Sequence, residues 1–420
     1  MTKYLPRIVD EEIEQKLQVV GAVLIEGCKW CGKSTTGAVH SKSVLEFQNP
    51  DNKSTYDDIA NSKPSLFLEG DKPRLFDEWQ MYPVVWDSVR TDVDHTGLRG
   101  QYILTGSAKP ADGSTMHTGT GRISRIVMRP MSLYESGDSD GKVSLKDIFE
   151  GKDIQAVNNI SLENIADVIV RGGWPASLSI EGELKYSSAS IYVNSLLHEE
   201  VNSLEKSERN INKMSAVLRS LARNISTSVS NSTLIKDVSN IFNDDISRPT
   251  LNDYINTLEK LFVVENINAT NLNIRSKSAM RTKNKKIFVD PSIATAILEL
   301  GPNDLIHDLN YFGFLFENLC LRDLKIYAQQ LNGDISFYRD ENDFEVDAIL
   351  RTQSGKWGAI EIKLGAGYIE SAAQNLLKFK EKVDIEKCGE PAFLMVLTGS
   401  SYSFRRPDGV YVVSIGSLKN

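Results

Sequence analysis

Short runs centred on apolar residues, each ending in glycine, acidic or hydroxyl residues, mark the first third of the chain. They lie at 22–25, 74–77 and 101–107, and the residues that follow Ser34 can open a helix. Short apolar runs bounded by turn residues are typical of buried strands. The pattern therefore predicts an α/β region that begins with a strand, a loop and a helix.

The middle of the chain has the spacing of helices. Apolar residues recur at helical spacing from about Leu162 to Leu204, interrupted by the Gly-Gly-Trp-Pro bend at 172–175. Beyond it we expect three short helices and a strand, at 215–224, 233–241, 248–262 and 262–266. Elements in this order predict a winged helix-turn-helix.

In DNA-binding proteins of this kind, the third helix enters the major groove. Here that helix carries five polar residues, Asn252, Asp253, Asn256, Thr257 and Glu259. Its two acids would oppose DNA phosphates, and winged helices also dock proteins or subunits. Both uses of the module stay open.

The last third alternates between apolar and polar residues in two segments. An amphipathic helix begins at 313–319 and carries Glu317 near its start. Strands are predicted at 343–350 and 357–363, with a turn at Ser354–Gly355 between them. Because side chains alternate along a strand, Glu361 and Lys363 share one face, and Asp347 on the neighbouring strand can converge with them.

Charge argues against a protein coated in basic residues, since the 420-residue chain has a net charge of −8 and a pI near 5.4. One segment, 266–286, is nonetheless basic and holds no acid among its cations, Arg275, Lys277, Arg281, Lys283, Lys285 and Lys286. It could follow a phosphate backbone, or it could be an exposed loop with a solvated face.

No stretch of the sequence approaches the roughly 20 apolar residues that span a bilayer, and the N-terminus lacks the apolar core of a signal peptide. We therefore expect a cytoplasmic protein without a membrane partner. The length predicts two to three domains.

Residues 27–34, Gly-Cys-Lys-Trp-Cys-Gly-Lys-Ser, form a complete G-x-x-x-x-G-K-[ST] phosphate-binding loop behind the first strand. Its backbone N–H groups and the following helix N-terminus can surround an anion. Lys33 would reach the β- and γ-phosphates, and the Ser34 hydroxyl would bind Mg²⁺. The predicted nucleotide contacts are Gly27, Cys28, Lys29, Trp30, Cys31, Gly32, Lys33, Ser34 and Thr35, and the expected cofactors are ATP and Mg²⁺.

Cys28 and Cys31 form a C-x-x-C inside this loop, which raises the alternatives of zinc binding or redox chemistry. The other two cysteines, Cys320 and Cys388, are isolated in the sequence, so no second ligand pair exists. Oxidation of the pair would distort the loop and inhibit nucleotide binding, which ATPase assays with oxidants can test.

A second nucleotide signal follows the loop. Asp77 and Glu78 end the run at 74–77, where Asp77 would hold Mg²⁺ and Glu78 would polarise the attacking water. Thr105 or Ser107 would sense the γ-phosphate. Arg122 and Arg125 are two candidates for an arginine that stabilises phosphoryl charge, acting in its own subunit or across a subunit interface.

Together these motifs resemble a prokaryotic family of AAA-like P-loop ATPases with a C-terminal domain of unknown function. The resemblance rests on the loop, on 76–80 (Phe-Asp-Glu-Trp-Gln), on 104–107 and on 129–135 (Arg-Pro-Met-Ser-Leu-Tyr-Glu). It extends to 171–175, 286–291 and 316–318. The Cys-Lys-Trp-Cys loop interior and Trp79 depart from the family's pattern. The resemblance implies a parallel-sheet ATPase core followed by a helical lid.

The C-terminal acids and lysine resemble the D…(E)xK core of restriction-endonuclease-like nucleases. In that interpretation Asp347 and Glu361 bind a divalent metal, Lys363 orients the attacking water, and Glu317 completes the site. The predicted α/β protein then has four parts: an ATPase core (1–140), a helical lid (141–206), a winged-helix-like module (207–270) and a nuclease-like domain (271–420).

Two functions remain open from the sequence. The first is an ATPase coupled to binding or cleavage of DNA or RNA by the C-terminal domain. The second is an ATP-driven switch whose winged-helix and C-terminal parts bind a protein or nucleic-acid partner without cleavage. An arginine that acts in trans would imply a homo-oligomer of unknown order.

Overall fold

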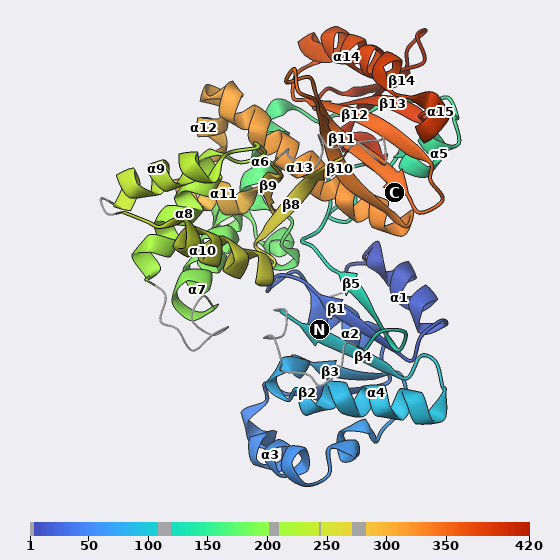
Figure 1. Ribbon diagram of the computed structural model, residues 1–420, viewed down its shortest axis with the longest axis vertical. Helices are drawn as coiled ribbons and strands as arrows, with labels where there is room; N and C mark the ends of the chain where they lie inside the picture. Colours follow the sequence, from blue (N-terminus) through green and yellow to red (C-terminus); the bar gives the residue numbers. More distant parts are fainter. Residues whose placement is uncertain (1–3, 108–118, 201–209, 243–244, 271–282) are drawn as a thin grey trace. The chain divides into compact units, whose positions relative to one another are not determined.

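The computed structural model describes residues 4–107, 119–200, 210–242, 245–270 and 283–420 (Figure 1). Their contacts divide them into two compact units. Unit 1 contains the described residues up to Pro130 together with Lys260–Phe262, and unit 2 contains nearly all of the rest from Met131 onward. Each unit has its own sheet and its own core.

Unit 1 is built on a parallel sheet with the strand order β2-β3-β4-β1-β5. The strands are β1 (Ala22–Glu26), β2 (Ser43–Glu46), β3 (Arg74–Asp77), β4 (Tyr102–Gly106) and β5 (Ile123–Val127). The helices are α1 (Val9–Leu17), α2 (Lys33–Val39), α3 (Lys53–Ser62) and α4 (Val84–Thr96). The predicted parallel sheet and its first strand–loop–helix unit are confirmed.

Aromatic side chains fill the core of unit 1. Phe47 stacks on Phe76 at a ring-centroid distance of 6.1 Å, and Trp79 lies 5.0 Å from Trp86 of α4. Both tryptophans are almost fully buried. Trp79, the residue that departs from the family pattern, therefore packs in the core beside the acidic end of β3, where its large ring contributes buried apolar area.

Unit 2 contains, within its described residues, a nine-stranded mixed sheet of order β7-β14-β15-β13-β12-β11-β10-β8-β9. Its strands are β7 (Gln155–Val157), β8 (Val264–Ala269), β9 (Lys285–Phe288), β10 (Gly333–Arg339), β11 (Glu345–Thr352), β12 (Trp357–Lys363), β13 (Phe393–Thr398), β14 (Tyr402–Arg405) and β15 (Tyr411–Ser414). A separate pair joins β6 (Val143–Ser144) to β16 (Leu418–Lys419). The predicted turn at Ser354–Gly355 connects β11 and β12, which pair antiparallel.

The helices of unit 2 begin and end at local signals in the sequence. Ser161 and Asn164 form a capping box at the start of α6, and Gly172, with a φ of 75°, ends it. The α-helices are α5 (Leu145–Phe149), α6 (Leu162–Arg171), α7 (Ser187–Ser195), α8 (Ile211–Arg223), α9 (Asn231–Phe242), α10 (Arg248–Lys260), α11 (Ser292–Leu298), α12 (Pro302–His307), α13 (Leu309–Gln330), α14 (Ile369–Lys382) and α15 (Ile385–Cys388).

Two of the predicted parts contribute strands to sheets that they share with other parts of unit 2. Residues 141–206, expected to be a helical lid, also supply β6 and β7, and β7 pairs with β14 of the large sheet. The expected winged-helix strand forms at Val264–Ala269 as β8, which pairs with β9 on one side and with β10 on the other. Because a strand has two hydrogen-bonding edges, β8 joins the predicted winged-helix strand to the C-terminal sheet.

The sequence predicts four parts, whereas the contacts of the structure divide the chain into two units. The predicted boundary between residues 140 and 141 lies inside unit 2, which starts at Met131. In the part of the chain that the structure describes, no helix has the length and apolar character needed to cross a membrane.

Candidate functional site

The phosphate-binding loop connects β1 to α2 at the carboxyl edge of the parallel sheet in unit 1. Gly27 lies against the backbone of Met128, so that a Cβ at Gly27 would come within 2.0 Å of the Met128 carbonyl oxygen. Gly32 caps α2 with a φ of 100°. Both positions need glycine, because one lacks space and the other has left-handed backbone.

Lys33 is folded into the loop. Its Nζ donates a 2.7 Å hydrogen bond to the Cys28 carbonyl oxygen, and only 5% of the residue is exposed. The next two residues, Ser34 and Thr35, are exposed at the start of α2. The loop thus holds its lysine on the backbone that would surround a phosphate, with hydroxyl groups open beside it.

Arg7 is a second cation at this loop, and the sequence analysis missed it. Its guanidinium donates 2.7 Å hydrogen bonds to the carbonyl oxygens of Cys31 and Arg129, and the side chain is buried. A bidentate guanidinium is well suited to hold two backbone segments at a fixed spacing. Nothing local in the sequence marks Arg7, because it lies twenty residues before the motif begins at Gly27.

Cys28 and Cys31 are both buried in the loop as free thiols. The Cys31 thiol donates to the Met128 carbonyl oxygen at 3.4 Å. Burial raises the pKa of Cys31, but a hydrogen bond with Cys28 and the charges of Lys33 and Arg7 outweigh it and lower the pKa to about 6. Among the described residues, no group of three His, Cys, Asp or Glu side chains is placed to hold a metal ion, so the zinc alternative has no ligand set there.

Asp77 and Glu78 lie at the carboxyl end of β3, and Thr105 of β4 connects them. The Thr105 hydroxyl donates to Asp77 Oδ1 at 2.5 Å and accepts from the Glu78 backbone N–H at 3.3 Å. The Ser107 hydroxyl and the Gln80 amide both donate to Glu78 Oε2, the former at 3.2 Å. Glu78 has a positive φ of 55°, which is uncommon for a residue with a side chain and clusters at functional sites.

The strand register brings these groups to one edge. Thr105 on β4 is the partner of Ile25 on β1 and of Asp77 on β3. Since all three strands are parallel, the loop after β1 and the acids after β3 emerge on the same side. Thr105 is fully buried, so in this conformation its hydroxyl positions the acids instead of facing the loop.

Arg122 immediately precedes β5, and Arg125 lies in the middle of that strand. Arg125 pairs with Leu24 in register, forms an ion pair with Glu26 at 2.9 Å, and lies over the Trp86 ring at 5.3 Å.

The Arg122 carbonyl oxygen accepts from the Ala22 N–H, at the amino end of β1. At about 3.3 Å per residue, Arg122 is therefore ~16 Å from the loop of its own subunit. Arg122 also forms an ion pair with Asp94 at 2.5 Å, and its hydrogen bond lowers the pKa of Asp94.

The predicted C-terminal residues do come together in unit 2. Asp347 on β11 lies opposite Glu361 on β12, because Ala348 pairs with Ile360 in the antiparallel register. Lys363 Nζ is 2.9 Å from Asp347 Oδ2 and 2.7 Å from Glu361 Oε2. Asp347 Oδ2 also accepts from the Ile362 N–H at 2.8 Å, and Glu361 Oε1 accepts from Asn375 Nδ2 at 2.6 Å.

Lys285 of β9 lies among these acids, and the sequence analysis gave it a different role. Its Nζ is 2.8 Å from Glu317 Oε1, 2.6 Å from Glu345 Oε1 and 3.8 Å from Asp347 Oδ1. Only 2% of Lys285 is exposed, so it cannot follow a nucleic-acid backbone as the basic segment suggested. Its place could have been anticipated, because the period of two puts Lys285 on the same strand face as the apolar Ile287.

The rest of the basic segment divides in two. Arg275, Lys277 and Arg281 lie outside the described residues, and Lys283 is exposed. Lys286 binds Glu259 at 3.1 Å and Asn266 at 2.8 Å.

Burial and neighbouring charges have opposing effects on the pKa values of this cluster. Burial raises the pKa of Glu361 to about 8 and that of Glu317 to about 7. Burial would also raise the pKa of Asp347, but the charges of Lys363 and Lys285 outweigh it and lower that pKa. Burial opposes the charged form of Lys285, yet Glu317, Asp347 and Glu345 together raise its pKa above the ordinary value.

The structure therefore places two lysines among the acids of the metal site predicted on Asp347 and Glu361. The carboxylates of the cluster surround two lysine ammonium groups, and the described chain has no group of three metal-ligating side chains. The sequence pattern identified the right acids but omitted the cation that lies between them.

The polar face predicted on the third helix of the winged-helix module is partly used within unit 2. Thr257 is buried and donates to the Asp253 carbonyl oxygen at 2.9 Å. Glu259 accepts from Asn266 and from Lys286, and Asn252 accepts from Asn231. Asn252, Asp253 and Asn256 are exposed.

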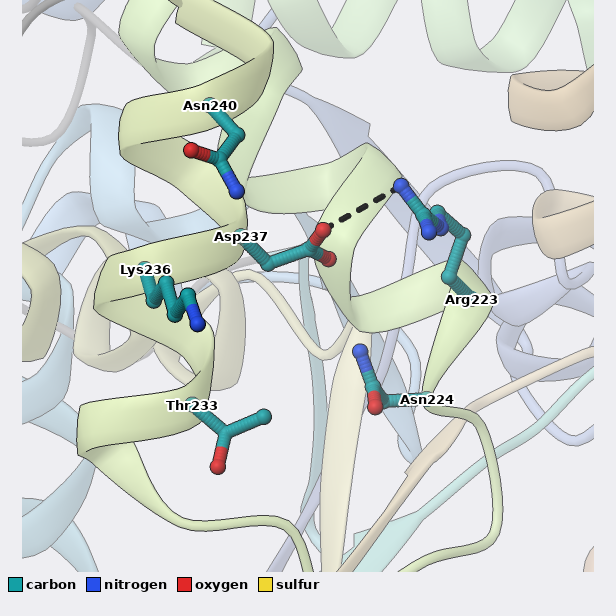
Figure 2. A pocket seen from close by; sticks show the side chains of 6 residues that line it. All are labelled: Arg223, Asn224, Thr233, Lys236, Asp237 and Asn240. Carbon is teal, nitrogen blue, oxygen red and sulfur yellow. Dashed lines mark ion pairs between the residues drawn. The ribbon is translucent and has the colours of Figure 1, made fainter.

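A polar pocket of about 280 Å³ lies instead between α8 and α9, where an Arg223–Asp237 ion pair of 3.1 Å crosses it (Figure 2). Its lining residues are Arg223, Asn224, Thr233, Lys236, Asp237 and Asn240.

Several motifs that carried the family resemblance meet at a buried charge in unit 2. Arg322 of α13 pairs with Asp290 at 2.8 Å and with Asp323 at 2.7 Å. Asp290 accepts from the Gly173 N–H, and Asp323 accepts from the Leu133 N–H, both at 2.9 Å. These motifs are structural: they connect the segments around 133, 173 and 290 to one helix.

Comparison with known proteins now defines the class. Residues 20–136 match the family model described as an AAA domain, so unit 1 contains a P-loop ATPase domain of the AAA type, which binds nucleotide. Residues 162–304 and 312–418 match two families described as domains of unknown function, DUF8612 and DUF4143. No curated protein matches the chain.

Two solved structures show distant likeness. One is the Walker-type ATPase PABY2304 of Pyrococcus abyssi, with 14% identity and a TM-score of 0.42 over 69% of this chain and 94% of that chain. The other is the replication initiator DnaA bound to AMPPCP and single-stranded DNA, with 13% identity and a TM-score of 0.27 over 60% of this chain and 86% of that chain.

Proposed function

We propose that unit 1 hydrolyses ATP with Mg²⁺ and that unit 2 binds a partner in response. The observation that supports hydrolysis, beyond nucleotide binding, is the Asp77–Thr105–Glu78 arrangement at the same sheet edge as the loop. A loop alone explains binding of a triphosphate. Two acids held at fixed positions beside it supply what hydrolysis needs as well.

The residues fit a magnesium nucleotide. The exposed Ser34 hydroxyl and the Asp77 carboxylate offer the hard oxygen ligands that Mg²⁺ prefers. When bound, Mg²⁺ neutralises charge on the β- and γ-phosphates. Lys33 leaves the Cys28 carbonyl and donates to phosphate oxygens, while the loop N–H groups surround the β-phosphate.

Glu78 accepts the proton of the attacking water in this scheme. Its carboxylate is oriented by Ser107 and Gln80, and its backbone by Thr105. A water placed between Glu78 and the γ-phosphorus is then directed for in-line attack. The charge that develops on the transferring group requires a further cation, for which Arg122 or Arg125 of a neighbouring subunit in a homo-oligomer is the candidate.

Replacing Lys33 tests the nucleotide site. Lys33→Ala removes the cation that contacts the phosphates, so we expect steady-state ATP hydrolysis to fall to background and ATP affinity to drop by at least about tenfold. Glu69→Gln, an exposed change in the same unit, is the control and keeps wild-type activity. Normal hydrolysis by Lys33→Ala would contradict the proposal.

For unit 2 we favour partner binding without cleavage, and retain the four-part division as the working domain plan. A D…ExK arrangement of Asp347, Glu361 and Lys363 supports a nuclease-like fold. Lys285 among the acids argues against the metal that cleavage of phosphodiesters would need. DNA, RNA and protein all remain candidate partners.

A nuclease assay separates the two alternatives. Defined single- and double-stranded DNA and RNA are incubated with the full chain and Mg²⁺ or Mn²⁺, with and without ATP. We expect no cleavage, and binding detected by fluorescence anisotropy identifies a nucleic-acid partner if there is one. Cleavage that is lost in Asp347→Ala or Glu361→Ala would establish the nuclease alternative instead.

A further inference from the structure

We propose that Lys285 is the resident cation of the C-terminal acidic cluster, and that its ammonium group occupies the position where a nuclease-like site would bind a divalent metal. The cluster consists of Glu317 on α13 and Glu345 and Asp347 on β11, with Lys285 on β9. The wild-type site accordingly takes up no Mg²⁺ or Mn²⁺. This goes beyond the proposed ATPase, which concerns unit 1.

The distances locate the ammonium at the shared centre of the acids. Lys285 Nζ is within 2.8 Å of oxygens from Glu317 and Glu345, and 3.8 Å from the nearest Asp347 oxygen. A divalent ion held by the same carboxylates would require oxygens at about 2.0–2.6 Å from one point. Because the ammonium already contacts two of these carboxylates and lies 3.8 Å from the third, a divalent ion bound by the same groups would have to displace it.

Backbone pairing also fixes the position of Lys285. Lys285 pairs with Ile267 in the β8–β9 register. Three residues on, Phe288 exchanges two 2.9 Å hydrogen bonds with the side chain of Asn318, on the same helix as Glu317. The lysine therefore enters the cluster from a strand that is paired to a neighbouring strand and bonded to α13, and its nitrogen cannot move away without breaking several ion pairs.

Electrostatic repulsion also argues against a divalent metal at this site. Placing a divalent cation beside a buried ammonium is strongly unfavourable in a site with little solvent, where charges are weakly screened. The second lysine, Lys363, binds the outer oxygens of Asp347 and Glu361. With both lysines in place, the cluster connects β9, α13, β11 and β12 through ion pairs.

The adjacent residue offers a matched control. Lys286 follows Lys285 on β9 and points to the other face, where it binds Glu259 and Asn266. Lys286→Met therefore makes the same change in charge and volume one residue away, without reaching the acids.

The test measures Mn²⁺ binding to the full chain without nucleotide, by isothermal titration calorimetry and by the loss of the free Mn²⁺ EPR signal. Wild type and Lys286→Met are expected to show no stoichiometric uptake. Lys285→Met is expected to bind one Mn²⁺ at least about tenfold more tightly than wild type. The added change Asp347→Asn removes that binding.

Two results would overturn the proposal. One is uptake of one Mn²⁺ by wild type that Asp347→Asn abolishes, which needs no folded Lys285 variant. The other is a Lys285→Met protein that has wild-type circular dichroism and takes up no Mn²⁺. Loss of ATPase activity in unit 1 variants would bear on the proposed function alone, so the two proposals fail separately.

Discussion

At the scale of single residues, Thr105 has the least obvious role in the nucleotide site. Its chemistry suggests a γ-phosphate sensor, yet its hydroxyl is buried and joins Asp77 to the backbone of Glu78. Thr105 therefore positions the two acids, and we expect its loss to affect catalysis more than nucleotide affinity.

Replacing Thr105 with valine tests this distinction. Thr105→Val keeps the shape of the side chain and removes the hydrogen bonds to Asp77 and to the Glu78 N–H, a loss of about 1.5 kcal/mol or more. We expect kcat for ATP hydrolysis to fall by roughly tenfold with little change in ATP affinity, measured by steady-state kinetics and calorimetry. If affinity fell and kcat did not, Thr105 would be contacting nucleotide directly.

The sequence predicted the site residues that belong to a local motif. It did not predict the residues that reach a site from elsewhere in the chain. Lys33 and Asp77 lie in local patterns whose chemistry requires those types. Arg7 has no local signature, and Lys285 has only its alternation with Ile287, which would have placed it on the inward face of the strand.

At the scale of elements, the β8–β9 pair shows where sequence patterns mislead. Three helices and a strand predict a winged helix-turn-helix. In the structure β8 continues into the nine-stranded sheet through β10, and the edge strand β9 is bonded by α13. Helix positions depend on local periodicity, so they were well predicted, whereas strand partners depend on contacts far along the chain.

The side chain of Asn318 binds the backbone of the edge strand β9. Its side-chain amide donates to the Phe288 carbonyl oxygen and accepts from the Phe288 N–H, both at 2.9 Å, in a fully buried place. Asn318→Ala leaves both backbone groups without these partners, so we expect the free energy of unfolding to drop by ~2–4 kcal/mol.

Urea denaturation followed by circular dichroism measures this loss. Asn303→Ala, an exposed asparagine on α12, is the control and should change stability by less than about 0.5 kcal/mol. Equal stability of Asn318→Ala and wild type would contradict the role given to the side chain.

At the scale of the whole molecule, the two compact units have different buried interiors. Unit 1 has an aromatic core beneath a nucleotide loop, and unit 2 has a buried Arg322 shared by Asp290 and Asp323. The class of unit 1 was predictable because a P-loop and its acids are encoded in short motifs. The function of unit 2 was not, because the residues that distinguish a metal site from an ion-pair cluster come from separate strands.

The buried charge predicts a pH dependence for unit 2. Burial raises the pKa of Asp323 to about 6, against the opposing effects of Arg322 and the Leu133 N–H, with Glu135 adding to the rise. Because the folded state then binds more protons than the unfolded state between about pH 4 and pH 6, Asp323 makes the protein less stable as pH rises through that window.

Asp323→Asn removes this titration. The difference in unfolding free energy between wild type and Asp323→Asn should fall by ~1–3 kcal/mol from pH 4 to pH 6.5 in urea titrations. A difference that grows with pH would mean that Arg322 lowers the pKa of Asp323 below its ordinary value, contrary to the structure.

The central claim is that unit 1 hydrolyses ATP with Glu78 as the base, and one measurement tests it most directly. Glu78→Gln keeps the shape of the side chain and removes its ability to accept a proton. In single-turnover experiments with Mg²⁺ and labelled ATP, we expect wild-type affinity for ATP and a hydrolysis rate reduced by about a hundredfold or more. Hydrolysis at the wild-type rate by Glu78→Gln would contradict the account.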